Sequence, residues 1–242
     1  MHKYAIVTGS SDRIGKAIAL QLTNMGYNLI LHYNHSLEKV HNLQSEIKNK
    51  GRDALLFHLD FLSSDSIDEK FKEFKDKGYN IELLINNASD YTSSDFTTAG
   101  INNFRMQMQI NFESPYLFIK AFANNYNSGC IINMLDTKIK KDCTNHLDYI
   151  LSKKMLRELT NLAAYKLAPN FRVNGIAPGL ILPPNGKDED YLKLKAQTIP
   201  LRITGDLSDI QQTVTFLAES PFITGQVIYV DGGEHLACNT IE

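Results

Sequence analysis

The 242-residue sequence has few cysteines, no long apolar run and no large excess of charge of either sign. Its three cysteines, Cys130, Cys143 and Cys238, are widely spaced and form no C-x-x-C pair. This excludes a disulfide framework and a cysteine-based zinc site and fits a reducing compartment. No apolar run approaches the roughly 18 residues that a membrane-spanning helix needs. The formal net charge of −2 removes the electrostatic argument for a nucleic-acid-binding protein.

The composition that remains is that of an ordinary globular protein. Hydrophobic residues make up 43% of the chain and charged residues 21%, which argues against disorder. The length fits one domain over residues 1–242, large enough to bury a full core. After Met1-His2-Lys3 the chain enters a strand-like run directly, so we expect no signal peptide and a soluble, cytoplasmic protein.

Short β-rich runs alternate with amphipathic helical stretches along the whole chain. The predicted strands are Tyr4–Thr8, Asn28–His32, Leu55–Leu59, Leu83–Asn86, Cys130–Met134, Arg172–Ile176 and Val227–Val230. Helical spacing follows Gly15 and covers about Leu37–Lys50, Ser66–Lys77, Ile101–Asn125 and Leu147–Leu167. This alternation predicts an α/β protein: a single-domain, doubly wound Rossmann fold with a seven-stranded parallel sheet flanked by helices. Ligands are then expected at the carboxyl ends of the strands.

One long stretch, Leu180–Ile199, has no clear periodicity and contains Pro183-Pro184-Asn185-Gly186. In a compact domain such a segment is usually a lid or a binding loop. We therefore expect a substrate loop at about residues 180–200.

A glycine-rich turn links the first predicted strand to the first helix. It reads Thr8-Gly9-Ser10-Ser11-Asp12-Arg13-Ile14-Gly15, and its glycines allow close backbone approach to a phosphate at the helix amino terminus. A plain strand-to-helix turn remains an alternative, since the spacing differs from G-x-G-x-x-G.

The residues after the second predicted strand favour NADPH over NADH. An NAD site needs a carboxylate there for the ribose 2′-hydroxyl. This chain reads Tyr33-Asn34-His35-Ser36, and the first acid is Glu38. A 2′-phosphate would meet the Arg13 guanidinium, an imidazole and a hydroxyl instead of a repelling carboxylate. His35 could equally be a solvated surface histidine.

Two pairs of polar residues are candidates for the chemistry. Tyr149 and Lys153 lie four residues apart at the start of a predicted helix, so both project from one face. A cationic Lys near a phenol stabilises the phenolate, which lowers the Tyr pKa and makes it a usable proton donor. Such pairs also occur by chance. Asn86-Asn87-Ala88-Ser89 closes the fourth predicted strand and Asn111 lies in a helix beyond it, where either Asn could be merely structural.

Together the motifs resemble the short-chain dehydrogenase/reductase family over essentially the whole chain. The matches, in order, are Thr8-Gly9-x-x-x-x-Ile14-Gly15, Asp60, Asn86-Asn87-Ala88, Asn111, Tyr149-x-x-x-Lys153, Pro178-Gly179 and Asp231-Gly232-Gly233. The resemblance implies that Tyr149 is the acid, that Lys153 holds the nicotinamide ribose and tunes Tyr149, and that Asn111 supports a water-linked proton path.

The same resemblance implies an NADP(H) site and an assembly. The implied cofactor contacts are Gly9, Ser11, Arg13, Ile14, Gly15, Tyr33, Asn34, His35, Ser36, Asp60, Phe61, Asn87, Ala88, Ser89, Tyr149, Lys153, Pro178, Gly179 and Leu180. Family members commonly form tetramers through two long helices. Apolar residues on the 101–125 helix permit this: Met106, Ile110, Tyr116, Leu117 and Ile119.

Two departures from the family pattern narrow the resemblance to pteridine reductases and bacterial dihydromonapterin reductases. Arg13 stands where the family has its second glycine, and Asp136, thirteen residues before Tyr149, stands where it has its catalytic Ser. The implied substrate is a dihydropterin, contacted by Arg13, Ser89, Asp136 and Tyr149, with the Tyr91 ring stacked on the pterin. Tyr91 could equally be an exposed tyrosine in a loop, because its neighbours are polar.

The chemistry of C=N reduction gives an independent reason for an acid at position 136. Reducing a ketone builds negative charge on oxygen, which an ionised carboxylate would repel. Reducing a ring C=N bond builds basicity on nitrogen, and a carboxyl group able to hold or relay a proton suits that task. The alternative is that Asp136 is a surface acid and that Thr137 takes the Ser position.

We therefore expect an NADPH-dependent reductase of a dihydropterin of the dihydromonapterin, dihydrobiopterin or dihydrofolate type, without a metal, in folate metabolism. Two other functions stay open on the sequence. One is a carbonyl reductase of the same family, acting on a 3-oxoacyl thioester or a small ketone. The other is a non-catalytic dinucleotide-binding regulator, against which the retention of both Tyr149 and Lys153 argues.

Overall fold

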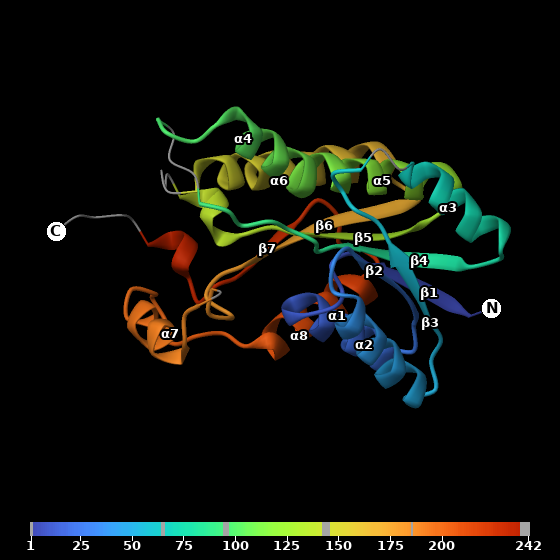
Figure 1. The fold of residues 1–242 in the computed structure, drawn as a ribbon, viewed down its shortest axis with the longest axis horizontal. Helices are drawn as coiled ribbons and strands as arrows, with labels where there is room; N and C mark the ends of the chain where they lie inside the picture. Colours follow the sequence, from blue (N-terminus) through green and yellow to red (C-terminus); the bar gives the residue numbers. More distant parts are fainter. Residues whose placement is uncertain (1, 64–65, 94–96, 142–145, 185, 238–242) are drawn as a thin grey trace.

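The computed structural model describes residues 2–63, 66–93, 97–141, 146–184 and 186–237. Its centre is one parallel sheet of seven strands in the order β3-β2-β1-β4-β5-β6-β7 (Figure 1). The predicted doubly wound α/β fold is confirmed, and observed strand ends lie within three residues of the predicted ones. The strands are β1 (Lys3–Val7), β2 (Asn28–Tyr33), β3 (Ala54–His58), β4 (Asn80–Asn86), β5 (Gly129–Met134), β6 (Phe171–Pro178) and β7 (Val227–Val230).

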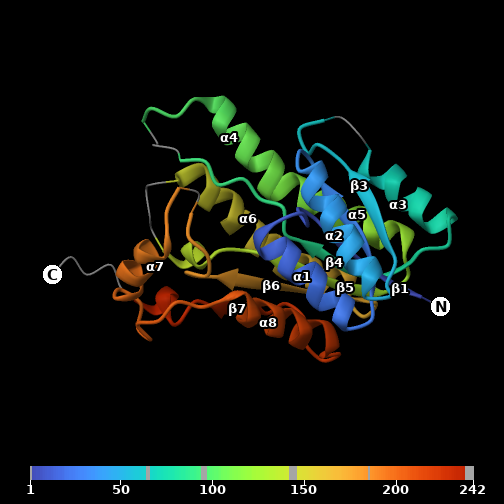
Figure 2. The same cartoon turned by 60° about the horizontal axis from the view of Figure 1, so that its bottom comes forward.

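Helices cover both faces of the sheet, as the two views in Figures 1 and 2 show. One face carries α1 (Arg13–Asn24), α2 (Leu37–Asn49) and α8 (Leu207–Glu219). The other carries α3 (Ile67–Asp76), α5 (Ser114–Asn125) and α6 (Leu147–Leu167), with α4 (Ile101–Met108) leading into α5. A short α7 (Glu189–Ala196) stands apart at the end of the sheet where the strands finish.

Alternating side chains of the central strands form two apolar cores. Ala5 and Val7 of β1 belong to the core beneath α1, α2 and α8, whereas Tyr4 and Ile6 belong to the opposite core. Because successive strand residues point to opposite faces, a strand covered on both sides must be apolar throughout. This is why the strands read as continuous hydrophobic runs, which made them predictable.

Three helical features differ from expectation. The long helix predicted over 101–125 is interrupted by a π-helical segment, Gln109–Glu113, with Asn111 at its centre. The stretch expected to be irregular contains α7, whose amino end is capped by the Asp188 side chain. The helix α8, with a capping box between Asp206 and Asp209, was not predicted at all.

Among the described residues, no helix is long and apolar enough to span a lipid bilayer. Cys130 is a free, buried thiol, while Cys143 and Cys238 lie outside the described part of the chain, as does Asn185 of the 180–200 segment.

Candidate active site

The glycine-rich turn is locked to the end of β4 by backbone and side-chain contacts. The Thr8 hydroxyl accepts hydrogen bonds from the backbone N–H groups of Asn87 (2.8 Å) and Ala88 (2.9 Å). The Asn87 amide donates in return to the carbonyls of Thr8 and Gly9. At Gly15 a Cβ atom would lie 2.1 Å from the Gly9 carbonyl oxygen, so only glycine lets the turn close this tightly.

Arg13 occupies a left-handed backbone conformation, with φ of 51°. Glycine adopts this region without strain, which explains why the related family pattern has glycine there. The exposed Arg13 guanidinium donates to the carbonyl of Pro183 at 2.8 Å. In this structure the side chain therefore connects the glycine turn to the 180–200 segment, and it lines the clefts on both sides of that contact.

His32, at the cofactor end of the site, is not among the residues predicted from the sequence to bind cofactor or substrate. It is only 3% exposed, its Nδ1 accepts from the Gly9 N–H at 3.0 Å, and its Nε2 lies 3.0 Å from the Leu59 carbonyl oxygen. Burial lowers the His32 pKa to about 4, so the ring is neutral and its Nε2–H is the donor to Leu59. His32 thus ties the glycine turn to the loop that follows β3.

A cleft of about 630 Å³ runs along the glycine turn and the ends of β2 and β3. In it, the Asn34 amide donates to the Asp60 carboxylate at 3.2 Å, which fixes the loop after β3. The predicted cofactor residues in its wall are Gly9, Ser11, Arg13, Ile14, Gly15, Tyr33, Asn34, His35, Ser36, Asp60, Phe61, Asn87, Ala88 and Ser89.

The predicted catalytic groups meet at the end of β5 and the start of α6. The Tyr149 hydroxyl donates to the Asp136 carboxylate at 2.9 Å. The other oxygen of Asp136 accepts from the backbone N–H of Lys138 at 2.8 Å. The Lys153 ammonium lies in the same cleft and donates to the Met134 carbonyl at 2.8 Å. Tyr149 and Lys153 are 5% and 3% exposed, so the reacting groups lie at the floor.

Burial changes the proton affinities of both side chains. It raises the pKa of Tyr149 well above its usual range, and the neighbouring Asp136 raises it further. The spacing of Tyr149 and Lys153 predicts that Lys153 lowers the Tyr149 pKa. That expectation is wrong for this structure, because Lys153 donates to Met134 and burial dominates. Burial lowers the pKa of Lys153 itself to about 8.

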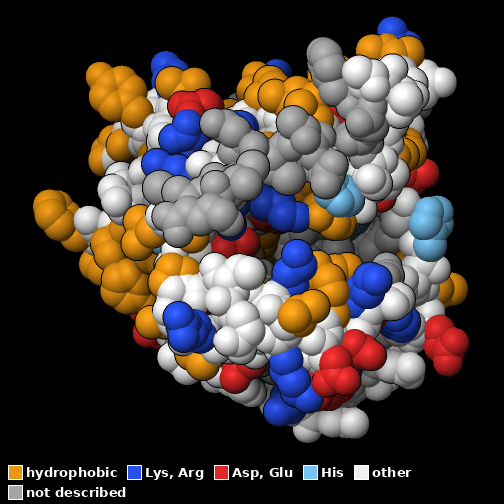
Figure 3. All heavy atoms as spheres, turned by 90° about the vertical axis from the view of Figure 1, so that its left-hand side faces the viewer, with side chains coloured by type: hydrophobic (Ala, Val, Ile, Leu, Met, Phe, Trp, Pro, Cys, Tyr) orange, Lys and Arg blue, Asp and Glu red, His pale blue; other side chains and the backbone are white. Residues whose placement is uncertain are grey.

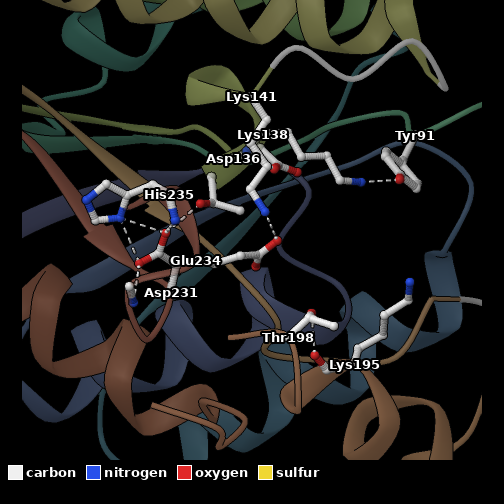
Figure 4. A network of polar contacts seen from close by, with 11 residues as sticks. Tyr91, Asp136, Lys138, Lys141, Lys195, Thr198, Asp231, Glu234 and His235 are labelled. Carbon is white, nitrogen blue, oxygen red and sulfur yellow. Dashed lines mark hydrogen bonds and ion pairs between the residues drawn. The ribbon is translucent and has the colours of Figure 1, made fainter. Parts of the chain in front are cut away.

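Thr137, the alternative to Asp136, points elsewhere. Its hydroxyl is buried and donates to the Asp231 carboxylate at 2.5 Å. Asp231 also accepts from the backbone N–H of His235 at 2.8 Å (Figure 4). These bonds hold the turn after β5 against the end of β7, which leaves Asp136 as the side chain that reaches Tyr149.

Asn111 lies beneath the site and is fully buried. Its amide oxygen accepts from the Ser89 hydroxyl and from the Asp90 N–H, both at 2.9 Å. Its amide nitrogen donates to the Asp90 carbonyl (3.0 Å) and to the Gln107 side chain (2.8 Å). With four such bonds, the Asn111 side chain positions the loop after β4, while its link to a proton path stays a prediction.

Tyr91 lies on the wall of a second cleft of about 650 Å³. Its ring stacks on His146, with centroids 4.1 Å apart, and meets the Tyr149 ring edge-on at 4.7 Å. Its hydroxyl accepts a hydrogen bond from the Lys138 ammonium (Figure 4). His146 was not singled out from the sequence; it precedes α6 in a left-handed conformation, three residues before Tyr149.

Three adjoining clefts share Arg13, Ile14 and Ser89 in their walls, so together they form one trough across the carboxyl ends of the strands. All predicted site residues line it except Asn111. Figure 3 shows this face hollowed near its centre, with Lys and Arg side chains around the hollow. A larger hollow of about 850 Å³ lies at the amino ends of β4 and β5 and contains none of the predicted residues.

The trough fits a dinucleotide with an additional phosphate. Gly9 and Gly15 line the cleft at the amino end of α1, and the residues directly after β2 offer amide, imidazole and hydroxyl groups with Arg13 nearby. No group of His, Cys, Asp and Glu side chains suited to a metal ion occurs within the described ranges.

Comparisons with known proteins cover nearly the whole chain. A family model described as enoyl-(acyl carrier protein) reductase matches residues 9–235. A 3-oxoacyl-(acyl-carrier-protein) reductase FabG of Staphylococcus epidermidis is 31% identical, over 98% of this chain and 100% of that protein. A dihydromonapterin reductase of Klebsiella pneumoniae is 28% identical, over 96% of each. The crystal structure of FolM alternative dihydrofolate reductase 1 from Brucella suis in complex with NADP superposes with a TM-score of 0.92, at 29% identity over 98% of this chain and 96% of that one.

Proposed function

Because the chain belongs to the short-chain dehydrogenase/reductase family of oxidoreductases, we propose that it reduces a dihydropterin to the tetrahydropterin with NADPH. The cofactor assignment is supported by the absence of a carboxylate directly after β2 and by the NADP complex of the similar FolM protein. The Klebsiella relative named dihydromonapterin reductase supports the substrate class.

One observation carries the proposal: the Asp136 carboxylate accepts a hydrogen bond from Tyr149 at 2.9 Å, at the position where the family pattern that this chain resembles has a serine. A carboxylate beside the phenol opposes the build-up of negative charge that ketone reduction requires. It suits a reaction in which the product atom is a basic nitrogen that takes up a proton.

Each group of the site has a defined part in this proposal. When bound, NADPH supplies the hydride that reduces the carbon of the ring C=N bond. Tyr149, whose hydroxyl is protonated at neutral pH, donates the proton to the ring nitrogen as that nitrogen becomes basic. Asp136 accepts the Tyr149 hydrogen bond and relays the replacement proton. Lys153 binds the nicotinamide ribose, and the Tyr91 ring stacks on the pterin.

Carbonyl reduction is the second candidate, and the FabG relative at 31% identity favours it. The two functions share the cofactor groups. They differ in what they need beside Tyr149, where ketone reduction needs a neutral donor and this chain has Asp136. The geometry at that position therefore favours C=N reduction over carbonyl reduction, although the sequence identity to FabG is slightly higher.

The test is NADPH consumption followed at 340 nm with a panel of 7,8-dihydrobiopterin, dihydromonapterin, dihydrofolate, acetoacetyl thioester and a small ketone. We expect turnover with the dihydropterins and little with the oxo compounds. Tyr149→Phe should lower dihydropterin turnover by about 10²- to 10⁴-fold with little change in NADPH affinity. Brisk activity on oxo compounds alone would establish the carbonyl reductase, and no consumption with any substrate would favour the regulator.

A further inference from the structure

The cleft beside Tyr91 carries more positive than negative charge. Although the chain has a net charge of −2, the cleft wall contains four cations and two acids. These side chains are Arg13, Lys138, Lys141, Lys195, Asp136 and Glu234. The balance is opposite in sign to that of the whole molecule, so it is a local feature of the site.

Both acids already have partners inside the site. Asp136 accepts from Tyr149 at 2.9 Å, and Glu234 pairs with Lys141 at 2.9 Å in a half-buried ion pair. Across the described ranges, neither Arg13 nor Lys195 forms an ion pair, and the Arg13 guanidinium donates to the neutral Pro183 carbonyl. The cleft therefore offers two cations that no acid in its wall offsets.

These cations lie at the mouth of the cleft, and the chemistry lies at its floor. Tyr149 is 5% exposed, whereas Arg13 and Lys195 are exposed. Lys195 extends from α7 toward the side of the cleft that holds Lys138 and Tyr91 (Figure 4). A flat ring held against Tyr149 and Tyr91 would leave its substituent to exit at the cleft mouth, beside Lys195.

Lys195 is separate from the dinucleotide groove. It lines the cleft beside Tyr91 and is absent from the wall of the cleft along the glycine turn, whereas Arg13 lines both. A phosphate of the cofactor would therefore meet Arg13, and Lys195 is left to face the second ligand.

We propose that Lys195 forms an anion subsite at the cleft mouth, and that the substrate is a dihydropterin whose substituent carries a carboxylate or a phosphate. This inference rests on the proposed function and names its substrate class. The two sources of the anion are a dicarboxylate tail, as in dihydrofolate, and a phosphate ester on a short side chain.

The test compares substrates of different charge on matched variants. The substrates are 7,8-dihydrobiopterin, which is neutral in its side chain, 7,8-dihydrofolate and 7,8-dihydroneopterin monophosphate. Lys195→Gln is compared with Lys187→Gln as control. Both lysines lie 6.0 Å from the centroid of the Tyr191 ring, but Lys187 does not line the cleft.

We expect Lys195→Gln to raise KM for an anionic substrate by about three- to tenfold with kcat unchanged, and so to lower its kcat/KM relative to dihydrobiopterin. The preference of the wild type for the anionic substrate should shrink as NaCl rises. Lys187→Gln should leave the substrate ratio as it is. A shift with dihydrofolate alone identifies the carboxylates as the ligand, and a shift with the monophosphate alone identifies the phosphate.

Equal effects of Lys195→Gln on neutral and anionic substrates, or no effect on either, would overturn the subsite while leaving pterin reduction intact. Failure of the wild type to reduce dihydrobiopterin as well as both anionic pterins would overturn the proposed function instead. The two failures are thus read from different measurements.

Discussion

At the scale of single residues, the site depends on groups whose protonation is set by burial. His32 is the clearest case, because its ring is neutral and both of its nitrogens bridge the loops that flank the cofactor cleft. A lone histidine within a strand gives no sequence signal of such a role, since its partners, Gly9 and Leu59, are 23 and 27 residues away. Only the fold brings them together.

His32 predicts how stability depends on pH. Its folded pKa of about 4 lies below the unfolded value of 6.5, so the unfolded chain binds more protons between these values. Its contribution to stability is complete above pH 6.5 and falls as the pH drops toward 4, by up to about 3 kcal/mol. The free energy of unfolding, measured with urea at pH 7.5 and at pH 5, should therefore fall less between the two pH values for His32→Gln than for the wild type. Equal losses would disprove this reading of His32.

At the scale of secondary-structure elements, the sequence predicted all seven strands but missed the π-helical segment and the helix α8. All seven strands were predicted, because strands buried on both faces are apolar throughout. The π-helical segment at Gln109–Glu113 was missed, since the hydrophobic spacing runs on through it. The capping box at Asp206 and Asp209 was a signal in the sequence that could have located α8.

The π-helical segment matters because it delivers Asn111 to the loop after β4. Asn111→Ala would leave Ser89, the Asp90 backbone and Gln107 without their buried partner. We expect a loss of about 2–4 kcal/mol in the free energy of unfolding, together with a lower kcat as Ser89 moves.

Asn111→Asp is the matched control for this prediction. It keeps both acceptor contacts to Ser89 and Asp90 and removes the two donor contacts. Ser89 should then stay in place, so the kcat of Asn111→Asp should exceed that of Asn111→Ala. A wild-type unfolding free energy for Asn111→Ala would contradict the positioning role.

At the scale of the whole molecule, one group of exposed apolar side chains lies on α5 and α6. Of the five residues expected to support assembly, Ile119 is 4% exposed and belongs to the core, which corrects that expectation, and Met106 and Ile110 line the cofactor cleft. Only Tyr116 and Leu117 are exposed. They are accompanied by a stripe on α6: Leu151, Met155, Leu162 and Tyr165.

We propose that this stripe, with Tyr165 90% and Leu162 69% exposed, joins copies of the chain. Leu162→Glu should reduce the mass measured by light scattering after gel filtration. Leu194→Glu, at an equally exposed leucine (71%) on α7, is the control and should not change the mass. An unchanged mass for Leu162→Glu, or a monomeric wild type, would refute the proposal.

The site as a whole was predicted well where it depends on motifs and poorly where it depends on contacts between distant segments. Asp136, Tyr149 and Tyr91 were named from spacing and resemblance, and the fold places them around one cleft. His146 and the Arg13–Pro183 contact were not foreseen, because both depend on how loops meet at the end of the sheet.

The most direct test of the account is the substrate preference of Asp136→Ser, which restores the hydroxyl used for carbonyl reduction. The measurement is the ratio of kcat/KM for 7,8-dihydrobiopterin to that for a small ketone, in the variant and in the wild type. We predict that the ratio falls by about 10²-fold or more, because the nitrogen loses its proton relay. Undiminished dihydrobiopterin reduction by Asp136→Ser would contradict the role assigned to this carboxylate.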